Sequence, residues 1–372
     1  MDLPANQSVN SLSKSMQIKP YLALPLQLSC KAINMLPSTA AARQQMLDTI
    51  AHCDRLIKGS MGFSATFSGT PVRLVVLPEY FLTSFPMGES IPAWIDKACL
   101  QVDGPEYEAL SDIAQKNNIY LSGNAYECDP NFPQLYFQTS FIVNDSGDVV
   151  LRYRRLISMF SPTPHDVLDA YFSKYGADSL FPVVDTELGR LACVASEEIL
   201  YPEITRAMAV NGAEVICHSS SEVASPRPTP KNIAKQARAY ENMLYVVSAN
   251  SAGIDNIPFP ASSTEGNSQV VDYKGQVLAE ASNGESMAGT AEIDIAKLRA
   301  SRDTPAMTNT LARQRLELFG GVYSKQSIYP ANNMLNKEGE VIVPDRSHFI
   351  ECQKTAISRL KTINGKTKSS KS

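Results

Sequence analysis

The sequence lacks the features typical of membrane, metal-binding and nucleotide-binding proteins. It has no run of about 18 apolar residues, the length that a membrane-spanning helix needs. Its four histidines show no HxxxH or HExxH spacing and its seven cysteines form no CxxC pair, so no zinc site is indicated. Neither GxGxxG nor the phosphate-binding GxxxxGK[ST] motif occurs. We therefore expect no metal, no cofactor and no membrane partner.

The net charge and the cysteines exclude further classes of protein. A net charge of −4 argues against a dedicated nucleic-acid-binding protein. The cysteines are odd in number and scattered, which favours free thiols in a reducing compartment over a disulfide framework. The apolar run from Tyr21 to Leu28 is short and interrupted by Pro25, so it predicts an edge or first strand rather than a signal peptide. We expect a cytoplasmic protein.

The composition is that of an ordinary globular chain, with 44% hydrophobic and 19% charged residues. Strand-like and helix-like segments alternate, which predicts one α/β domain over residues 18–300. We expect residues 1–17 to be flexible and residues 354–372, which are rich in lysine, to form a basic disordered tail. The extension over residues 301–353 carries apolar side chains that we expect to pack on a second subunit: Leu316, Leu318, Phe319, Val322 and Tyr323.

Continuous apolar runs predict strands that are covered on both faces. The expected strands are Val72–Leu77, Asn118–Ser122, Phe137–Val143, Asp148–Tyr153, Leu191–Ala195, Ala213–His218, Leu244–Ala249 and Gln269–Val271. Turn residues at 144–147 and 272–275 predict two hairpins. The expected helices are Ala40–Lys58, Gly104–Lys116, Pro202–Asn211 and Pro230–Asn242, the last two with proline in the first turn.

Polar side chains follow three of these strands, where open α/β sheets place their ligands. Glu79 follows the strand ending at Leu77, and burial there would suit a general base. Arg155 ends a cationic run after the strand at 148–153, and a cation can stabilise an oxyanion. Ser196 lies on a strand-to-helix turn, as nucleophiles do in other folds. Each residue also has a structural interpretation: a capping carboxylate, a solvated charge and a helix cap.

Together the three segments resemble the nitrilase, or carbon–nitrogen hydrolase, superfamily. Accessory segments agree with that resemblance: Gly212–Ile216, Arg238–Asn242 followed by Ser248–Asn250, and Gly266–Ser268 followed by Asp272–Gly275. The resemblance covers about residues 20 to 297. It implies a four-layer αββα sandwich of α/β class, usually assembled as a homodimer or larger homo-oligomer. It also implies a Glu, Lys and Cys triad acting on an amide or nitrile carbon.

This chain departs from the family triad at two of its three positions. Glu79 matches the glutamate, but Arg155 stands at the lysine position. Family spacing, with a glycine seven residues before the nucleophile and Pro-Glu six and seven after it, selects Ser196, with Glu198 at an acidic position two residues on. Cys193 lies three residues earlier, and strand alternation turns it to the opposite face.

A serine needs stronger activation than a thiol, because its hydroxyl is far less acidic. Arginine keeps the positive charge of lysine but does not move a proton. His165 and Asp166 are therefore candidates to support Ser196, since many family members carry a second active-site carboxylate in this loop. His218, at a strand end, is another candidate. A capping aspartate, a surface histidine and a packed histidine are the structural alternatives.

The leading hypothesis is a hydrolase of a non-peptide C–N bond in a small amide, carbamoyl or nitrile substrate, with Ser196 as nucleophile, Glu79 as base and Arg155 as oxyanion support. A serine acyl-enzyme could instead pass its acyl group to an amine, which would make the protein an amide-forming acyl transferase. A second hypothesis is a catalytically silent member that binds a small molecule or a partner. A third uses Cys193 as the nucleophile.

Overall fold

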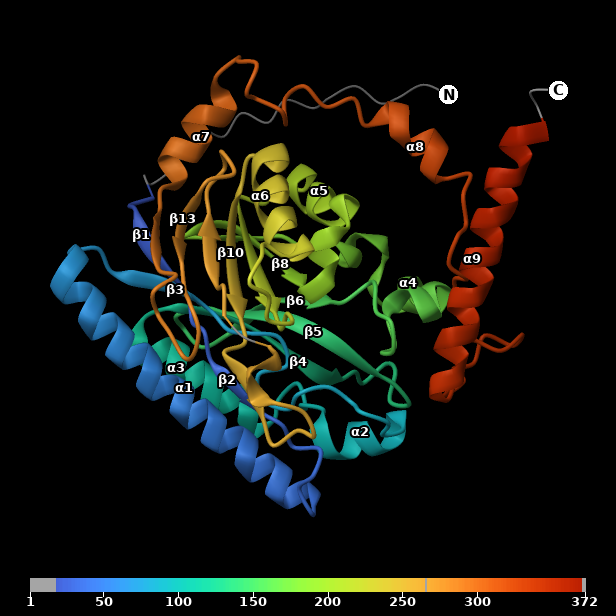
Figure 1. Ribbon diagram of the computed structural model, residues 1–372, viewed down its shortest axis with the longest axis horizontal. Coiled ribbons are helices and arrows are strands. Elements are labelled where there is room, and N and C mark those ends of the chain that lie inside the picture. The colour runs from blue at the N-terminus through green and yellow to red at the C-terminus, as the bar shows by residue number, and fades with distance from the viewer. Residues whose placement is uncertain (1–17, 265, 370–372) are drawn as a thin grey trace.

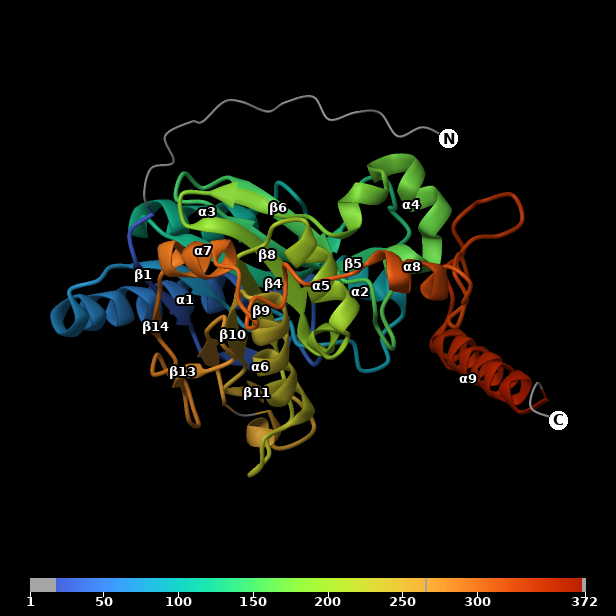
Figure 2. The same ribbon diagram turned by 90° about the horizontal axis from the view of Figure 1, so that it is seen from above.

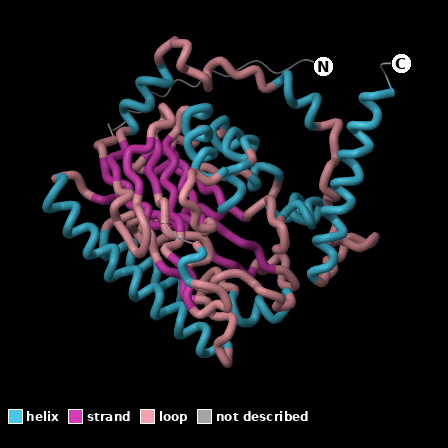
Figure 3. Tube along the Cα trace, viewed as in Figure 1, coloured by secondary structure: helices cyan, strands magenta, loops and turns pink. Residues whose placement is uncertain are grey.

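The computed structural model describes residues 18–264 and 266–369, with side chains described up to residue 363. Two six-stranded mixed sheets lie face to face, and helices cover their outer faces (Figure 1, Figure 3). The predicted αββα sandwich is therefore confirmed. The expected flexible segment 1–17 lies outside the described residues. No helix within the described ranges is long and apolar enough to cross a membrane.

The first sheet has the strand order β14-β1-β3-β4-β5-β6. Its strands are β14 (Ala291–Ile293), β1 (Tyr21–Pro25), β3 (Val72–Val76), β4 (Tyr120–Cys128), β5 (Tyr136–Val143) and β6 (Val149–Arg154). β1 pairs with β3 in parallel and with β14 in antiparallel fashion. The expectation of an edge or first strand is confirmed in its second form: β1 is the first strand of the chain, and it is not at the edge because β14 returns from a distant part of the chain to pair with it.

The second sheet has the order β13-β12-β10-β9-β8-β7. Its strands are β13 (Val277–Glu280), β12 (Gln269–Val271), β10 (Tyr245–Asn250), β9 (Val215–Ser220), β8 (Gly189–Ala195) and β7 (Val184–Thr186). β8, β9 and β10 run parallel, so their carboxyl ends share one edge. A separate two-stranded ribbon joins β2 (Ser29–Lys31) to β11 (Gly253–Asp255).

Helices complete the outer layers. α1 (Thr39–Ser68), α2 (Ile91–Ala98) and α3 (Pro105–Asn117) lie over the first sheet, and α5 (Pro202–Val210) and α6 (Pro230–Asn242) lie over the second (Figure 1). α1 continues ten residues beyond its expected end, until Gly69 ends it in a left-handed conformation at φ 68°. α4 (Leu168–Tyr175) and the 3-10 turns η1 (Pro164–Val167), η2 (Ala177–Leu180), η3 (Ser196–Leu200) and η4 (Ala261–Ser263) fill the connections.

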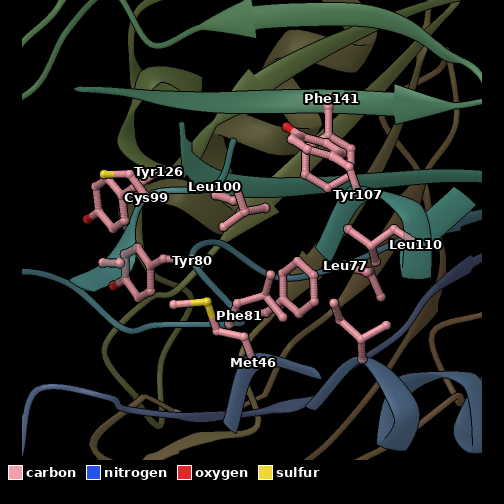
Figure 4. Close-up of a cluster of buried hydrophobic side chains, with 14 of the residues drawn as sticks. Met46, Leu77, Tyr80, Phe81, Cys99, Leu100, Tyr107, Leu110, Tyr126 and Phe141 are labelled. Carbon is pink, nitrogen blue, oxygen red and sulfur yellow. The ribbon is translucent and has the colours of Figure 1, made fainter. Parts of the chain in front are cut away.

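The outer core beneath α1 and α3 anchors the segment that follows β3. Met46 of α1, Tyr107 of α3 and Phe141 of β5 belong to one cluster of buried side chains, in which Tyr107 packs on Phe141 (Figure 4). Tyr80 and Phe81 belong to the same cluster. Because burying an aromatic side chain stabilises a core by about 2–3 kcal/mol, these two residues hold the preceding Glu79 in place.

The C-terminal extension runs from α7 (Ile295–Asp303) past α8 (Glu317–Tyr323) to α9 (Arg346–Ser369), at the end of the molecule opposite α1 (Figure 1, Figure 2). α9 replaces the disordered tail that the lysine content predicted from residue 354. Its first turns are anchored by Phe349 and Cys352, which are buried, and this allows the helix to continue into the basic segment. The apolar side chains of α8 are exposed in the single chain, so their contact with a second subunit stays a prediction.

Candidate active site

A cavity of about 360 Å³ lies where strands of both sheets end. Glu79, Arg155 and Ser196, the three residues selected from the sequence, all line it. Two hydrogen bonds join the two sheets at this edge: the Glu79 N–H donates to the carbonyl of Ser220 at 3.2 Å, and the Ser219 hydroxyl donates to the carbonyl of Leu77 at 2.7 Å. The carboxyl ends of β3 and β9 therefore form one rigid edge for the cavity.

Glu79 is 2% exposed and is oriented by side chains of the first sheet. Its Oε1 accepts from Arg155 Nη1 at 3.0 Å and from Gln138 Nε2 at 2.8 Å. Gln138 also donates to the Oδ1 of Asn124 at 2.9 Å, which in turn accepts from the Tyr80 N–H. Both hydrogen bonds found for the Glu79 side chain among the described residues go to Oε1, so Oε2 has no hydrogen-bond donor among them.

Arg155 is held by four acceptors. Nε donates to the Ile157 carbonyl at 2.7 Å, Nη1 donates to Gln138 and Glu79, and Nη2 pairs with Glu197 at 2.6 Å. Burial disfavours the charge, yet the carboxylates of Glu79 and Glu197 outweigh it and raise the pKa of Arg155 above its ordinary value. A guanidinium has five N–H donors, so one on Nη2 remains for a ligand. Arg155 is a fixed positive charge in the cavity.

Ser196 lies on a strained turn directly after β8. Its φ of 49° is in the left-handed region, which costs a residue with a side chain about 1–3 kcal/mol. The side chain is not bonded to Glu79. Instead its Oγ accepts from Lys231 Nζ at 3.1 Å, and Lys231 also donates to the Ser220 hydroxyl at 3.4 Å. Lys231 is in the first turn of α6 and lines the same cavity.

His218 supports the Ser196 turn from below. It is fully buried on β9, and its Nε2 lies 2.8 Å from the Ser196 carbonyl while its Nδ1 lies 2.8 Å from the Ser248 hydroxyl. A carbonyl only accepts, so Nε2 carries the proton and Nδ1 accepts from Ser248. Burial, followed by Lys235 and Lys231, lowers the pKa of His218 well below its ordinary value, so the ring is neutral. His218 is a positioning residue that contacts the backbone of Ser196 and not its hydroxyl.

Glu198 joins the Ser196 turn to the segment that carries Arg155. Its Oε1 accepts from the Leu156 and Ile157 N–H groups at 2.7 and 3.0 Å, and its Oε2 accepts from the Tyr153 hydroxyl at 2.8 Å. Burial raises the pKa of Glu198 to about 7, against the lowering effect of Arg155 and of these donors. Glu198 is therefore an internal clamp, since it does not line the cavity.

Cys193 lies in the core between the two sheets. It is fully buried, its Sγ is 3.7 Å from the Ser122 hydroxyl on β4, and it does not line the cavity. Burial, together with Cys217, raises the pKa of its thiol well above the ordinary value, which opposes formation of a thiolate. This geometry argues against Cys193 as the nucleophile.

Replacing Cys193 with alanine is therefore expected to leave any turnover within about twofold. Loss of a buried sulfur should lower the free energy of unfolding by about 1–2 kcal/mol, because the atoms around it relax only in part. Urea unfolding and a turnover assay on the same preparation check both values. A loss of activity with an unchanged free energy of unfolding would indicate that Cys193 takes part in the reaction.

His165 and Asp166 are not brought to Ser196. They line a neighbouring, more apolar cavity of about 900 Å³. Asp166 Oδ2 accepts from the Thr163 N–H and hydroxyl, both at 2.8 Å, and its Oδ1 accepts from Asn333. His165 packs against the ring of Tyr329, and burial lowers its pKa. Their expected support of Ser196 was wrong, because Asp166 caps the turn η1 and is fully bonded in that role.

Lys231, Gln138 and Arg346 line the cavity and were missed from the sequence. Gln138 is the third residue of a strand that was expected, and Lys231 is the second residue of a helix that was expected. The polar glutamine in an apolar run was a usable signal for the first. Nothing local distinguishes Lys231 or Arg346 from solvated lysines and arginines.

Comparison with known proteins gives the family of the chain. The family model for carbon-nitrogen hydrolases matches residues 33–303. The chain therefore belongs to the carbon-nitrogen hydrolase family.

Particular relatives are distant. The nitrilase and fragile histidine triad fusion protein NitFhit of Caenorhabditis elegans is 29% identical over 250 residues, which cover 66% of this chain and 54% of that protein. A formamidase of Helicobacter acinonychis is 27% identical over 223 residues, covering 58% and 60% of the two chains. The matched region thus spans little more than half of these relatives. The crystal structure of Nit3 of Saccharomyces cerevisiae, of the nitrilase superfamily, has a TM-score of 0.59 at 22% identity, covers 78% of this chain and 95% of that one, and shows the shared fold.

Proposed function

We propose that this chain hydrolyses a non-peptide C–N bond in a small amide through an acyl-enzyme on Ser196. The observation that carries the proposal is the 3.1 Å contact from Lys231 Nζ to Ser196 Oγ, in the cavity that also holds the Glu79–Arg155 pair. The family of the chain, which includes proteins named formamidase and omega-amidase, supports the same reaction class.

The proposed acylation step uses Lys231 as the proton acceptor. Ser196 Oγ attacks the amide carbon while Lys231 Nζ takes the hydroxyl proton, as in other serine–lysine pairs. The carbonyl oxygen becomes an oxyanion, which the positive charge of Arg155 stabilises. Collapse of the intermediate breaks the C–N bond, and the departing amine takes the proton from Lys231. The product of this step is a serine ester.

The proposed deacylation step uses Glu79. A water molecule attacks the ester carbon while the free Oε2 of Glu79 accepts its proton. The C–O bond to Ser196 breaks, the serine oxygen regains a proton from Glu79, and the carboxylic acid leaves. The strained φ of Ser196 and its His218 and Glu198 supports keep the hydroxyl in place during both steps.

The test is a labelling experiment combined with a substrate panel. A fluorophosphonate is expected to attach to Ser196, as mapped by peptide mass, and small amides and nitriles are assayed for turnover. Ser196→Ala should lower kcat by about 10³-fold or more and abolish labelling, because the nucleophile is removed. A hydroxylamine acceptor tests for acyl transfer, since it would yield a hydroxamate.

The other hypotheses give different results in this experiment. Tight binding without turnover or labelling would indicate a silent family member, and loss of activity on alkylation of Cys193 by iodoacetamide would indicate the thiol mechanism. The variant Ser196→Cys distinguishes a lost nucleophile from a functional serine. If the intact protein is inactive and the variant gains amidase activity, the nucleophile had been lost. If the variant is less active than the intact protein, the serine is adapted to its site. Binding without turnover, or evidence for Cys193 as the nucleophile, would overturn the serine proposal.

A further inference from the structure

The cavity of about 900 Å³ beside the Ser196 cavity takes no part in the proposed reaction. This apolar cavity lies between the family domain and the C-terminal extension, which is beyond the residues matched by the family model. Apolar side chains from both parts form most of its wall, among them Leu168, Leu180 and Phe181 of the domain and Ile328, Tyr329 and Leu360 of the extension. Such a volume and lining are typical of sites for small molecules.

Hydrogen bonds hold the extension at the apolar cavity. The Asn332 N–H donates to the His165 carbonyl at 3.1 Å, and the Met334 N–H donates to the Asp166 carbonyl at 2.9 Å. Asn333 Nδ2 donates to Asp166 Oδ1 at 2.6 Å. The extension is thus fixed to the loop that carries His165 and Asp166, so its side chains form a defined wall of the cavity.

The charge in the wall of the apolar cavity is negative. Apart from tyrosines, its ionisable side chains are Glu197, Asp166 and His165, and no lysine or arginine among the described residues lines it. Burial lowers the pKa of His165 below its ordinary value, so the ring is neutral. Asp166 is 3% exposed and accepts from the neutral groups of Thr163 and Asn333, with no ion pair among the described residues. A buried carboxylate without a compensating cation favours a positive charge nearby.

Glu197 lies between the two cavities and lines both. Its Oε1 pairs with Arg155 at 2.6 Å, while its Oε2 has no hydrogen-bond donor among the described residues. An ammonium group bonded to Oε2 would therefore leave the pair with Arg155 intact. Tyr201 and Tyr329, which are also in the wall of the apolar cavity, present aromatic rings, and the face of such a ring attracts a cation.

The Ser196 cavity has the opposite balance of charge. Three cations line it beside two carboxylates: Arg155, Lys231 and Arg346 beside Glu79 and Glu197. An amine is therefore favoured in the apolar cavity and disfavoured beside the nucleophile.

We propose that the apolar cavity is a second binding site, and that its ligand is a small amine with an apolar body. The ammonium group lies near Asp166 and Glu197, and the apolar body lies against the side chains that the domain and the extension contribute. The proposal does not depend on hydrolysis at Ser196, because it rests on the shape and charge of a separate cavity.

Calorimetry with three ligands that share one apolar body tests the role of charge. Phenethylamine, phenethyl alcohol and hydrocinnamate carry an ammonium group, a hydroxyl and a carboxylate on the same phenylalkyl group. The intact chain should bind the amine about 10- to 100-fold more tightly than the alcohol, the range of a charge-assisted hydrogen bond, and the carboxylate least tightly. Equal binding of the amine and the alcohol, or tightest binding of the carboxylate, would overturn the proposal.

The variant Glu197→Gln removes one of the two negative charges at nearly constant volume. It should weaken binding of the amine about 3- to 10-fold and leave binding of the alcohol within twofold, because only the amine carries a charge. Equal changes for the two ligands would show that the carboxylate of Glu197 does not contact the ammonium group, and the proposed site would be wrong.

Two tryptophan variants on α9 test the location of the amine. Ala356 lines the apolar cavity, whereas Thr355 beside it is exposed and does not. Ala356→Trp fills the cavity and should weaken binding of the amine at least tenfold, and Thr355→Trp should leave it within twofold. Thermal unfolding shows whether both variants are folded; if Ala356→Trp is not, the Glu197→Gln result decides. Unchanged binding in a folded Ala356→Trp would place the amine elsewhere and overturn the proposal.

The binding measurements also separate this site from the proposed function, since they need no turnover. Binding of the amine by a chain that shows neither turnover nor labelling of Ser196 would reject the hydrolase and keep the second site. Turnover in a chain that binds no amine would reject the second site and keep the hydrolase.

Discussion

Replacing Lys231 with methionine is expected to lower kcat by about 10²- to 10⁴-fold and to abolish labelling of Ser196 by a fluorophosphonate. A serine hydroxyl attacks poorly until a base removes its proton, and Lys231 Nζ is the titratable group bonded to Ser196 Oγ among the described residues. Methionine fills similar space but has no nitrogen. Steady-state turnover and the rate of labelling, followed by intact mass, measure the two effects.

Two further variants distinguish a proton acceptor from a mere positive charge. Lys231→Arg keeps the charge but does not accept a proton, so it should be as inactive as Lys231→Met. Lys235→Met removes the lysine one turn further along α6, whose Nζ donates to Asn232 and not to Ser196. Burial lowers the pKa of Lys235 to about 8, which means that the charged form of this side chain is disfavoured in the folded protein. An uncharged methionine should therefore preserve the fold and the activity. Activity in Lys231→Arg would show that charge alone suffices.

The convergence of Glu79, Arg155 and Ser196 follows from the sequence. Glu79 and Ser196 follow apolar, buried strands, Arg155 follows the half-buried strand β6, and strand ends meet at an edge of the sheet. The αββα layers follow from the same alternation of strands and amphipathic helices together with the family resemblance. Helix α6 begins and ends at the expected residues, because Pro230 and its Thr229 cap mark the start and the left-handed Met243 follows its end.

The partners of these residues depend on packing between distant segments. Lys231 reaches Ser196 across 35 positions of sequence, and Arg346 enters the cavity from an extension that follows the domain. In the sequence both are indistinguishable from solvated cations. His165 and Asp166 show the opposite case, in which a sequence that suggested a catalytic loop forms a structural turn. Asp166 accepts its hydrogen bonds from Thr163, three residues earlier, and so caps the turn. The local sequence pattern thus predicts the strand or helix on which a side chain lies, and tertiary contacts determine which residues it contacts.

Replacing Glu79 with glutamine should lower kcat by about 10²- to 10³-fold while Ser196 is still labelled by the fluorophosphonate. Glutamine retains an oxygen that accepts from Arg155 and Gln138, but it takes no proton from water. The Lys231–Ser196 contact does not involve Glu79, so acylation should proceed and a stable acyl-enzyme should accumulate. Rapid quenching and intact mass of the protein after mixing with substrate detect that ester.

Glu197→Gln is the matched control, because Glu197 is the other carboxylate paired with Arg155, at 2.6 Å, and its side chain is 39% exposed. Loss of the Glu197 charge should lower kcat by less than about fivefold, as expected of a half-exposed ion pair. Equal losses in the two variants would mean that both act only through the charge balance at Arg155. Loss of labelling in Glu79→Gln would instead make Glu79 the base for Ser196, and Lys231 would then serve to orient the hydroxyl.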